Sequence, residues 1–387
     1  MNELSLAPLP WPQAPAPGLA FPYMVWAHEK PARTQAPLSN SGVPNAQADF
    51  LQSYRIDVNH PGQSALPAFE AAIAARLGVP KEAVIATPGA SGGLAATALA
   101  LFPGNCVAVE VPGYEQLRSL ALRFAAQAVV LPRRLEHGFA VRPEDLGRAL
   151  QGAQRQGQQG HAFLTNTHNP SGAQLSRSEM AALAEVCAHH RGALISCDIY
   201  QEFLPVAERA WTCTVAPNTV TIGSLTKAYG LGPLRLGWIA LGSGLMDLRH
   251  QVRDATYLLW VDPPTTTLQA GVAALSHLNE LRAHADRAQA QSKPLLDHWL
   301  RTTPELEAHV PAHGLVSFPR VRGLGADASR NGHACAEWLV QHAGVDVVPG
   351  EFFGAPGHLR VSCGLPPETL GPALERLTLG LRTFLQH

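Results

Sequence analysis

Short apolar runs alternate with amphipathic stretches from about residue 68 to residue 270. Three of the amphipathic stretches place apolar side chains at helical spacing, over 69–78, 92–102 and 177–192. The apolar runs are five to eight residues long and predict buried strands, at 83–87, 105–111, 126–132, 161–166, 193–198, 219–225 and 234–241. Short buried strands separated by helices are typical of an α/β fold, so we predict a mostly parallel seven-stranded sheet flanked by helices.

The pattern changes after about residue 270. A long helical run covers 268–300, and two strand candidates at 314–318 and 358–363 precede a closing helix. This mixture predicts a smaller α+β C-terminal domain. We therefore expect three parts: an N-terminal arm with part of the small domain over 1–45, a large domain over 46–270, and a small domain over 271–387. The proline-rich segment 7–22 predicts an extended arm.

Composition excludes several classes of protein. The chain has 387 residues, 46% of them hydrophobic and 15% charged, with a formal net charge of −1. This charge provides no field that would recruit nucleic acid or a membrane surface. No apolar run reaches the roughly 20 residues that span a bilayer, and the N-terminus does not resemble a secretory signal. We expect a cytoplasmic protein.

Cysteine and histidine spacing gives no sign of a metal site. The six cysteines stand singly, without a C-x-x-C motif, which predicts free or buried thiols in a reducing compartment. The 17 histidines show no metal-ligand spacing, and the pair His189-His190 is better explained as the end of a helix. We predict no structural metal.

One lysine stands out because lysine is rare in this chain. Of the 29 basic residues, four are lysines, at positions 30, 81, 227 and 293, which leaves 25 arginines. Lys227 lies in "GSLTKAYGLGPLRLGW" (223–238), between an apolar strand and a glycine-rich turn. A solvated surface lysine is one explanation. The other is that the chemistry needs an amine that can lose its proton, which a guanidinium does not do in proteins.

A glycine-rich turn, "TPGASGG" (87–93), connects the first predicted strand to a helix. Such a turn lets backbone N–H groups approach a phosphate at the helix N-terminus. The same turn fits a dinucleotide-binding fold, for which Glu110 is a candidate ribose ligand. Against that alternative, the turn does not lie near the start of the fold.

The stretch around Lys227 resembles the pyridoxal-phosphate signature of the class I/II aminotransferases, which share the fold of aspartate aminotransferase (fold type I). The resemblance implies that Lys227 forms the internal aldimine with pyridoxal 5'-phosphate and acts as the general base. It also implies that Ser224, Thr226 and Arg235 bind the cofactor phosphate. A P-loop is not a competing explanation, because its G-x-x-x-x-G-K-[ST] pattern is absent.

Further motifs follow in the order that this family uses. "NTHNPSG" (166–172) implies a hydrogen bond from Asn169 to the phenolic oxygen of the cofactor, and "VPGY" (111–114) implies that Tyr114 stacks on its ring. The remaining assignments by resemblance are Ala90 and Ser91 for the phosphate, and Arg360 with Gly42 for the substrate carboxylate.

The loop "LISCDIYQEF" (194–203) departs from the family pattern. The family has an aspartate three residues before a tyrosine, and that aspartate keeps the pyridine nitrogen protonated. Here Asp198 lies two residues before Tyr200, and Cys197 occupies the position three residues before it. We expect Asp198 to reach the nitrogen, with Tyr200 also at the cofactor. The alternative is that the Cys197 thiol faces the ring, which would weaken the electron sink.

A homodimer with shared active sites is also implied by the resemblance. The tyrosine that the family contributes across the interface has Tyr54 as its nearest counterpart, with Asn59 or His60 as replacements. The segment 257–271 resembles the region near that interface. In the segment 22–30, Trp26 and His28 either contact a substrate or pack inside the protein.

The function predicted from these motifs is a pyridoxal-phosphate-dependent aminotransferase for an L-amino acid and a 2-oxo acid. Elimination, cyclisation and oxidative reactions of the same cofactor stay open, because they use the same residues and because the segment 38–43 resembles amino-acid cyclases of secondary metabolism. A dinucleotide-dependent oxidoreductase is the alternative outside the family. A regulator with this fold is not expected, because the chain offers no room for a DNA-binding domain.

Overall fold

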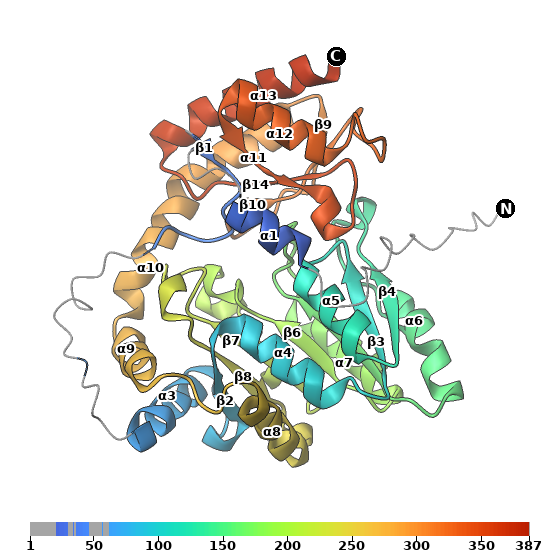
Figure 1. The fold of residues 1–387 in the computed structure, drawn as a ribbon, viewed down its shortest axis with the longest axis vertical. Helices are drawn as coiled ribbons and strands as arrows, with labels where there is room; N and C mark the ends of the chain where they lie inside the picture. The colour runs from blue at the N-terminus through green and yellow to red at the C-terminus, as the bar shows by residue number, and fades with distance from the viewer. Residues whose placement is uncertain (1–20, 30–33, 35, 46–55, 57–61, 387) are drawn as a thin grey trace.

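The computed structural model describes residues 21–29, 34, 36–45, 56 and 62–386 (Figure 1). The predicted arm over 7–22 lies almost entirely outside these residues, and so do Tyr54, Asn59 and His60. Within the described chain, a large sheet with its helices lies below a smaller group of helices and strands in Figure 1.

A seven-stranded sheet forms the centre of the large region (residues 62–275). The strands are β2 (Val84–Thr87), β3 (Cys106–Val111), β4 (Gln127–Pro132), β5 (Gly160–Thr165), β6 (Leu194–Cys197), β7 (Thr219–Ser224) and β8 (Gly237–Leu241). Their order is β2-β8-β7-β6-β5-β3-β4, and β8 alone runs antiparallel to its neighbours in this sheet. The prediction of a mostly parallel seven-stranded sheet is confirmed.

Helices cover both faces of this sheet. They are α3 (Gly62–Leu77), α4 (Gly89–Leu101), α5 (Glu115–Phe124), α6 (Pro143–Arg155), α7 (Arg177–His189), α8 (Arg249–Leu259) and α9 (Thr265–Leu275). Apolar side chains of α4, α5 and α8 form one core with Ile195 of β6. Those of α6 and α7 form another core with Leu194 on the opposite face. Neighbouring residues of β6 therefore face different helix layers, as the pleat of a strand requires.

The small region (residues 278–386) packs around short strands. Its helices are α10 (Leu278–Arg287), α11 (Lys293–Thr302), α12 (Gly332–Ala343) and α13 (Pro367–Gln386), with the π-helical turn η8 (Ala288–Ser292) between α10 and α11. Its strands are β9 (Leu306–Glu307), β10 (Val316–Ser317), β11 (Arg320–Val321), β12 (Val345–Asp346), β13 (Val348–Pro349) and β14 (Leu359–Ser362). The N-terminal strand β1 (Ala36–Pro37) pairs with β12, which joins the start of the chain to its end.

The domain limits stay a prediction, and two local features differ from the sequence-based expectations. Helix α9 runs without a break across the expected limit at residue 270. The last strand of the large sheet begins at Gly237 rather than at 234, because Gly232–Leu234 form a 3-10 turn and Arg235 adopts a left-handed conformation with φ 48°. Residues Pro22–Glu29 form a helix, α1. No helix among the described residues is long and apolar enough to cross a membrane.

Candidate active site

A cavity of about 420 Å³ lies between the N-terminal segment and the large region. Its walls come from α1, from the loop 39–45 after β1, and from the turn that follows β7. Lys227 is part of this last wall. In open sheets of this kind, ligands bind beyond the carboxyl ends of the parallel strands, and the turn after β7 lies at such an end.

The amine of Lys227 is held without a carboxylate partner. Its Nζ donates a 2.9 Å hydrogen bond to Oγ of Ser41. Burial lowers the pKa of this amine to about 8, and the positive charges of Arg360 and Arg235 add to the decrease. Among the described residues, no ion pair joins Lys227 to an acid. Lys227 is therefore ready to supply a neutral amine, which is the form that attacks a carbonyl or accepts a proton.

The N-terminus of α4 and Arg235 form a cradle. Gly89 opens α4 with φ +71°, and a Cβ built there would lie 2.8 Å from Nη2 of Arg235. A Cβ on Gly237 would lie 2.9 Å from the backbone nitrogen of Ala90. Glycine is therefore required at both positions for the backbones and the guanidinium to approach so closely.

This cradle fits a phosphate. The first turn of α4, with Ala90 and Ser91, has backbone N–H groups without partners inside the helix, and its dipole favours an anion. Ser224 ends β7 and Thr226 follows it, and the N–H of Thr226 donates a 3.4 Å bond to Oγ of Ser224. Two hydroxyls, a guanidinium and a helix N-terminus are donors of the kind that bind phosphate.

Arg360 on β14 is the second cation of the site. It is 1% exposed. Its Nη1 donates to Oδ1 of Asn169 (3.0 Å), while Nη2 donates to the hydroxyl of Tyr23 (3.0 Å) and to the carbonyl of Ser39 (2.7 Å). Its Nε has no hydrogen-bond partner among the described residues. A buried guanidinium surrounded by neutral acceptors can gain a large stabilisation from a carboxylate ligand.

Asn169 and Tyr114 lie on the loops that follow β5 and β3. The backbone N–H of Asn169 donates to Oγ1 of Thr165 (3.0 Å), which fixes the loop onto the end of β5. Burial raises the pKa of Tyr114 well above its usual range. The Tyr114 hydroxyl is 3.9 Å from Sδ of Met24 on α1. The structure thus places Asn169, Tyr114, Arg360 and Lys227 around one site, as the motifs predict.

Gly42 also lies in this site, directly against the lysine. A Cβ on Gly42 would be 2.9 Å from the carbonyl oxygen of Lys227 and 3.1 Å from its Cδ. The N–H of Val43 donates a 3.0 Å bond to the same carbonyl. The loop after β1 therefore packs on the lysine backbone, and only glycine fits at position 42.

Asp198 does not lie where we expected it. Its carboxylate is fully buried and accepts hydrogen bonds from the hydroxyls of Ser196, Thr212 and Thr221 and from the N–H of Thr212. Burial raises its pKa to about 7, against the effect of these bonds. Ser196 and Thr221 are paired across β6 and β7 and therefore point to the same face. Neighbouring Cys197 belongs to the core on the other face.

Other predicted residues have structural roles. Glu110, the candidate ribose ligand, is buried and forms a 2.7 Å ion pair with Arg133 and bonds to Thr165. This arrangement removes the support for a dinucleotide site. His190 lies at the C-terminal end of α7, as expected for a helix end. No group of three or more possible metal ligands occurs among the described residues.

Sequence reasoning missed Tyr23, Ser41 and Glu115. Tyr23 covers Arg360, with the centre of its ring 5.6 Å from the guanidinium carbon. Glu115 is buried and accepts a 2.8 Å bond from the N–H of Tyr23 in the first turn of α1, which fixes this helix over the site. The segment that contains Ser41 was singled out from the sequence, but this was because of Gly42. Trp26, by contrast, was noted, and it packs against Phe352 while it lines the cavity.

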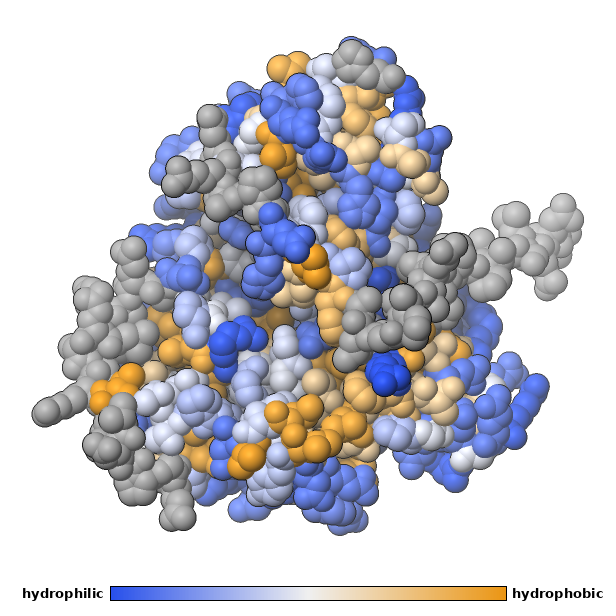
Figure 2. Space-filling model, viewed as in Figure 1, coloured by the Kyte–Doolittle hydropathy of each residue, from blue (hydrophilic) through white to orange (hydrophobic). Residues whose placement is uncertain are grey.

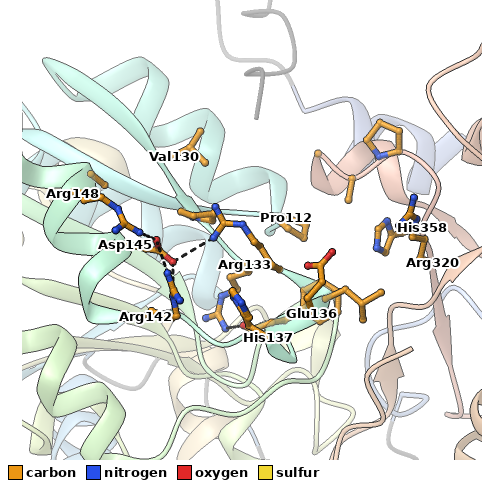
Figure 3. A pocket seen from close by; sticks show the side chains of 18 residues that line it. Pro112, Val130, Arg133, Glu136, His137, Arg142, Asp145, Arg148, Arg320 and His358 are labelled. Atoms are coloured by element: carbon orange, nitrogen blue, oxygen red, sulfur yellow. Dashed lines mark hydrogen bonds and ion pairs between the residues drawn. The ribbon is translucent and has the colours of Figure 1, made fainter. Parts of the chain in front are cut away.

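A larger cavity of about 1130 Å³ is lined by α6, Pro112 and the small-region residues Arg320 and His358 (Figure 3). Arg134, Arg142 and Arg148 converge there on the carboxylate of Asp145. No lysine of the described part of the chain lines this cavity. The candidate active site is therefore the smaller cavity at Lys227.

Comparison with known proteins identifies the family. Residues 46–377 match the family of class I and II aminotransferases. The chain belongs to this family. An arginine–pyruvate transaminase of Pseudomonas aeruginosa is 31% identical over 307 residues, which are 78% of this chain and 75% of that protein. Capreomycidine synthase of Streptomyces vinaceus is 28% identical over 377 residues, 92% of this chain and 91% of that protein.

Solved structures agree on the fold. A PLP-dependent aminotransferase from Streptococcus suis superposes with a TM-score of 0.82 at 21% identity, covering 94% of this chain and 98% of that chain. Aspartate aminotransferase from Thermus thermophilus with maleate gives 0.78 at 24% identity, covering 94% and 97%. The chain therefore has the fold type I architecture and is, by family, a pyridoxal-phosphate-dependent aminotransferase. The glycine cradle, and cations that have no acidic partner within the described residues, fit this cofactor.

Proposed function

We propose that this aminotransferase exchanges an amino group between an L-amino acid and a 2-oxo acid at Lys227. The observation that carries the proposal is the pair of buried cations, Lys227 and Arg360, that lie close enough to influence each other and have no acidic partner among the described residues. Two buried positive charges without acidic partners are unfavourable. The negative charges of an amino acid carboxylate and of a phosphorylated cofactor would both stabilise them.

The cofactor, when bound, accepts electrons from the substrate α-carbon and carries the amino group between the two substrates. Ala90, Ser91, Ser224, Thr226 and Arg235 would hold its phosphate, as the cradle at Gly89 suggests. Tyr114 would cover its ring, Asn169 would bind its phenolic oxygen, and Tyr200 would lie at the same site.

Different residues of this chain would bind the substrate and accept its proton. Arg360 would bind the α-carboxylate through its planar guanidinium. Gly42, which packs against Lys227, would lie near that carboxylate. Lys227 would accept the α-proton on Nζ. Its pKa of about 8 suits a base that works near neutral pH, since a lysine with the ordinary value would stay protonated.

Reduction with borohydride tests the lysine assignment. After incubation with pyridoxal phosphate, we expect the reduced cofactor to be attached to the peptide that contains Lys227. Lys227→Ala should abolish this attachment, while the matched variant Lys81→Ala at an exposed lysine should retain it. Attachment at another lysine, or none in the wild type, would refute the proposal. Conversion of the cofactor to its aminated form with a panel of amino acids would then identify the amino donor.

A different reaction on an amino acid is the second candidate. The similarity to capreomycidine synthase covers 92% of this chain, and Asp198 is engaged with hydroxyl groups away from Cys197. Both observations favour a cofactor environment that differs from that of an ordinary aminotransferase. Stoichiometric 2-oxo acid with aminated cofactor would support transamination. A cyclised or unsaturated product with unchanged cofactor would support the alternative.

A homodimer is part of the proposal. Tyr257, Leu258, Leu259 and Val261 are 45–76% exposed at the end of α8. Figure 2 shows hydrophobic surface over the part of this face where Figure 1 has α8. Exposed apolar clusters of this kind mark interfaces. Light scattering should give a dimer, and Leu258→Glu should yield monomers. A wild-type monomer would refute the proposed homodimer.

A cytoplasmic location stays a prediction.

A further inference from the structure

The orientation of the residues that end β6 is fixed by its neighbours in the sheet. Ser196 is paired with Thr221 of β7, and Cys197 is paired with Ile222 of β7 and Thr165 of β5. Because successive side chains of a strand alternate between faces, Ser196 and Cys197 point in opposite directions. Cys197 shares its core with Ile195 and Ile222, under the helices α4 and α5. Helix α4 provides the phosphate cradle, so Cys197 lies on the cofactor side.

Asp198 is held on the opposite side by four hydrogen bonds. Its Oδ1 accepts from Oγ of Ser196 (2.6 Å) and from Oγ1 of Thr212 (3.0 Å). Its Oδ2 accepts from the N–H of Thr212 (2.9 Å) and from Oγ1 of Thr221 (2.7 Å). Turning the carboxylate toward the cofactor would break these bonds and leave several buried donors without a partner, which is unfavourable inside a protein.

Cys197 is surrounded by residues of the active site. It is 1% exposed, and it is close enough to Lys227, Tyr114 and Tyr200 to influence their ionisation. Burial raises the pKa of the thiol to about 12, so the group is neutral. Glu110 is the other carboxylate that influences Cys197, and it is engaged by Arg133 and Thr165. Neither Asp198 nor Glu110 is therefore available to the cofactor.

The residue that faces the ring nitrogen of the cofactor can be inferred by excluding the atoms that already have partners. The cradle at Gly89 accounts for the phosphate, Lys227 for the aldehyde carbon and Asn169 for the phenolic oxygen. The ring nitrogen is the polar atom left without a partner, and Cys197 is the buried group on this face that lies near Lys227, Tyr114 and Tyr200 and has no other assigned role. We infer that the Cys197 thiol, rather than a carboxylate, faces the ring nitrogen of the cofactor. This inference rests on the proposed function, because it requires the cofactor at Lys227.

The chemical consequence concerns the strength of the electron sink. A carboxylate stabilises a protonated pyridine nitrogen, whereas a neutral thiol offers only a weak hydrogen bond and no charge. The cofactor would then withdraw electrons less strongly, which slows removal of the α-proton. This property would distinguish the enzyme from a relative that has a carboxylate at this position.

A cofactor analogue that lacks the ring nitrogen tests the inference directly. We would titrate apoenzyme with pyridoxal 5'-phosphate and with 1-deazapyridoxal 5'-phosphate, in which a C–H replaces the nitrogen, and compare the dissociation constants. For the wild type we expect the two constants to agree within about fivefold, which corresponds to ~1 kcal/mol. Cys197→Asp should create a preference of tenfold or more for the natural cofactor, because a charge-assisted hydrogen bond to the ring nitrogen is stronger than a neutral one.

Two further variants distinguish the alternatives. Cys197→Ser should leave the wild-type ratio within the same fivefold limit, and Asp198→Asn should lower the melting temperature without changing the ratio. A wild-type preference above fivefold would overturn the inference, and its loss in Asp198→Asn would assign the ring nitrogen to Asp198. If Asp198→Asn does not fold, the wild-type ratio decides alone, and a value above fivefold overturns it. A protein that binds neither compound at Lys227 would instead refute the proposed function.

Discussion

The guanidinium of Arg360 donates a 3.0 Å hydrogen bond to Oδ1 of Asn169, 191 residues earlier in the chain. Arg360 belongs to β14 of the small region, and Asn169 follows β5 of the large sheet. The proposed ligand of the substrate carboxylate is thus held in place by the proposed ligand of the cofactor. Tyr23 of α1 completes the arrangement with its 3.0 Å bond to Nη2 of Arg360. Three segments that are distant in sequence therefore define the position of one guanidinium.

Replacing Arg360 tests whether its guanidinium binds the substrate carboxylate. We expect Arg360→Lys to lower kcat/KM for every amino acid by roughly 10- to 100-fold, because an ammonium cannot make two parallel bonds to a carboxylate and one charge-assisted bond is worth ~1.5–3 kcal/mol. Tyr23→Phe removes only a neutral partner of Arg360 and should cost about fivefold. Steady-state kinetics with the amino donor that the cofactor-conversion panel selects measures both effects.

The control for this series is Arg382→Lys, at an arginine that is 50% exposed and paired with Glu305. It should leave kcat/KM unchanged. An Arg360→Lys variant with wild-type kcat/KM would show that the substrate carboxylate binds elsewhere.

Two glycines with the same backbone conformation test the phosphate cradle. Gly89 and Gly78 have φ of +71° and +72°, but a Cβ would meet Arg235 only at Gly89, since nothing lies within 4 Å of a Cβ at Gly78. Both alanine variants should lose about 1 kcal/mol of unfolding free energy, because alanine is strained in this conformation. Only Gly89→Ala should bind pyridoxal phosphate more weakly, by roughly 10- to 100-fold, because it displaces a phosphate ligand.

Apoenzyme titration by cofactor absorbance gives the dissociation constants, and chemical denaturation gives the stabilities. Equal cofactor affinity of the Gly89→Ala and Gly78→Ala proteins would contradict the cradle.

The strands were predictable because buried parallel strands are continuous apolar runs. The predicted strand 219–225, for example, differs from the observed Thr219–Ser224 by one residue. The side chain orientation at the end of β6 was not predictable in the same way. An error of one residue in the position of a strand exchanges its two faces, and the sequence "SCDIY" fits either alignment. The hydroxyls that engage Asp198 come from positions 196, 212 and 221, and only the folded sheet brings them together.

The contacts of α1 and of the loop after β1 were also hidden in the sequence. Tyr23 and Arg360 are 337 residues apart, and Ser41 and Lys227 are 186 residues apart. Neither segment contains a motif that specifies its partner. Local motifs predicted roles for residues with intrinsic chemistry, such as Lys227 and Arg360. They could not identify the residues that become important only by contact.

The pKa of Lys227 predicts how the stability of the apoenzyme depends on pH. An exposed lysine has the ordinary value of 10.5, and the folded state lowers it to about 8. Below pH 8 both states carry the proton, and the folded state carries the cost of a buried charge. Between pH 8 and 10.5 the unfolded state binds more protons, so this cost disappears as the pH rises. Lys227→Met should therefore be more stable than the wild type at pH 7 by about 1–2 kcal/mol, allowing for screening by water in the cavity.

This stability difference should be much smaller at pH 10, as measured by urea denaturation of the two apoproteins. Lys81→Met, at an exposed lysine, should change the unfolding free energy equally at both pH values. A Lys227→Met advantage that does not depend on pH would mean that packing, rather than the buried charge, is responsible.

Gly42 provides a test of how closely the loop after β1 must approach Lys227. A Cβ at this position would lie 2.9 Å from the backbone oxygen and 3.1 Å from the Cα of the lysine, and the backbone cannot yield as a flexible side chain would. We expect Gly42→Ala to lose roughly 1–3 kcal/mol of unfolding free energy and to form the covalent link to pyridoxal phosphate more slowly, because the loop must move away. Gly147→Ala in α6 is the matched control, since nothing lies within 4 Å of its Cβ. It should gain about 0.5–1 kcal/mol, as alanine does in a helix. If both variants gain stability and link the cofactor at the wild-type rate, the loop does not position Lys227.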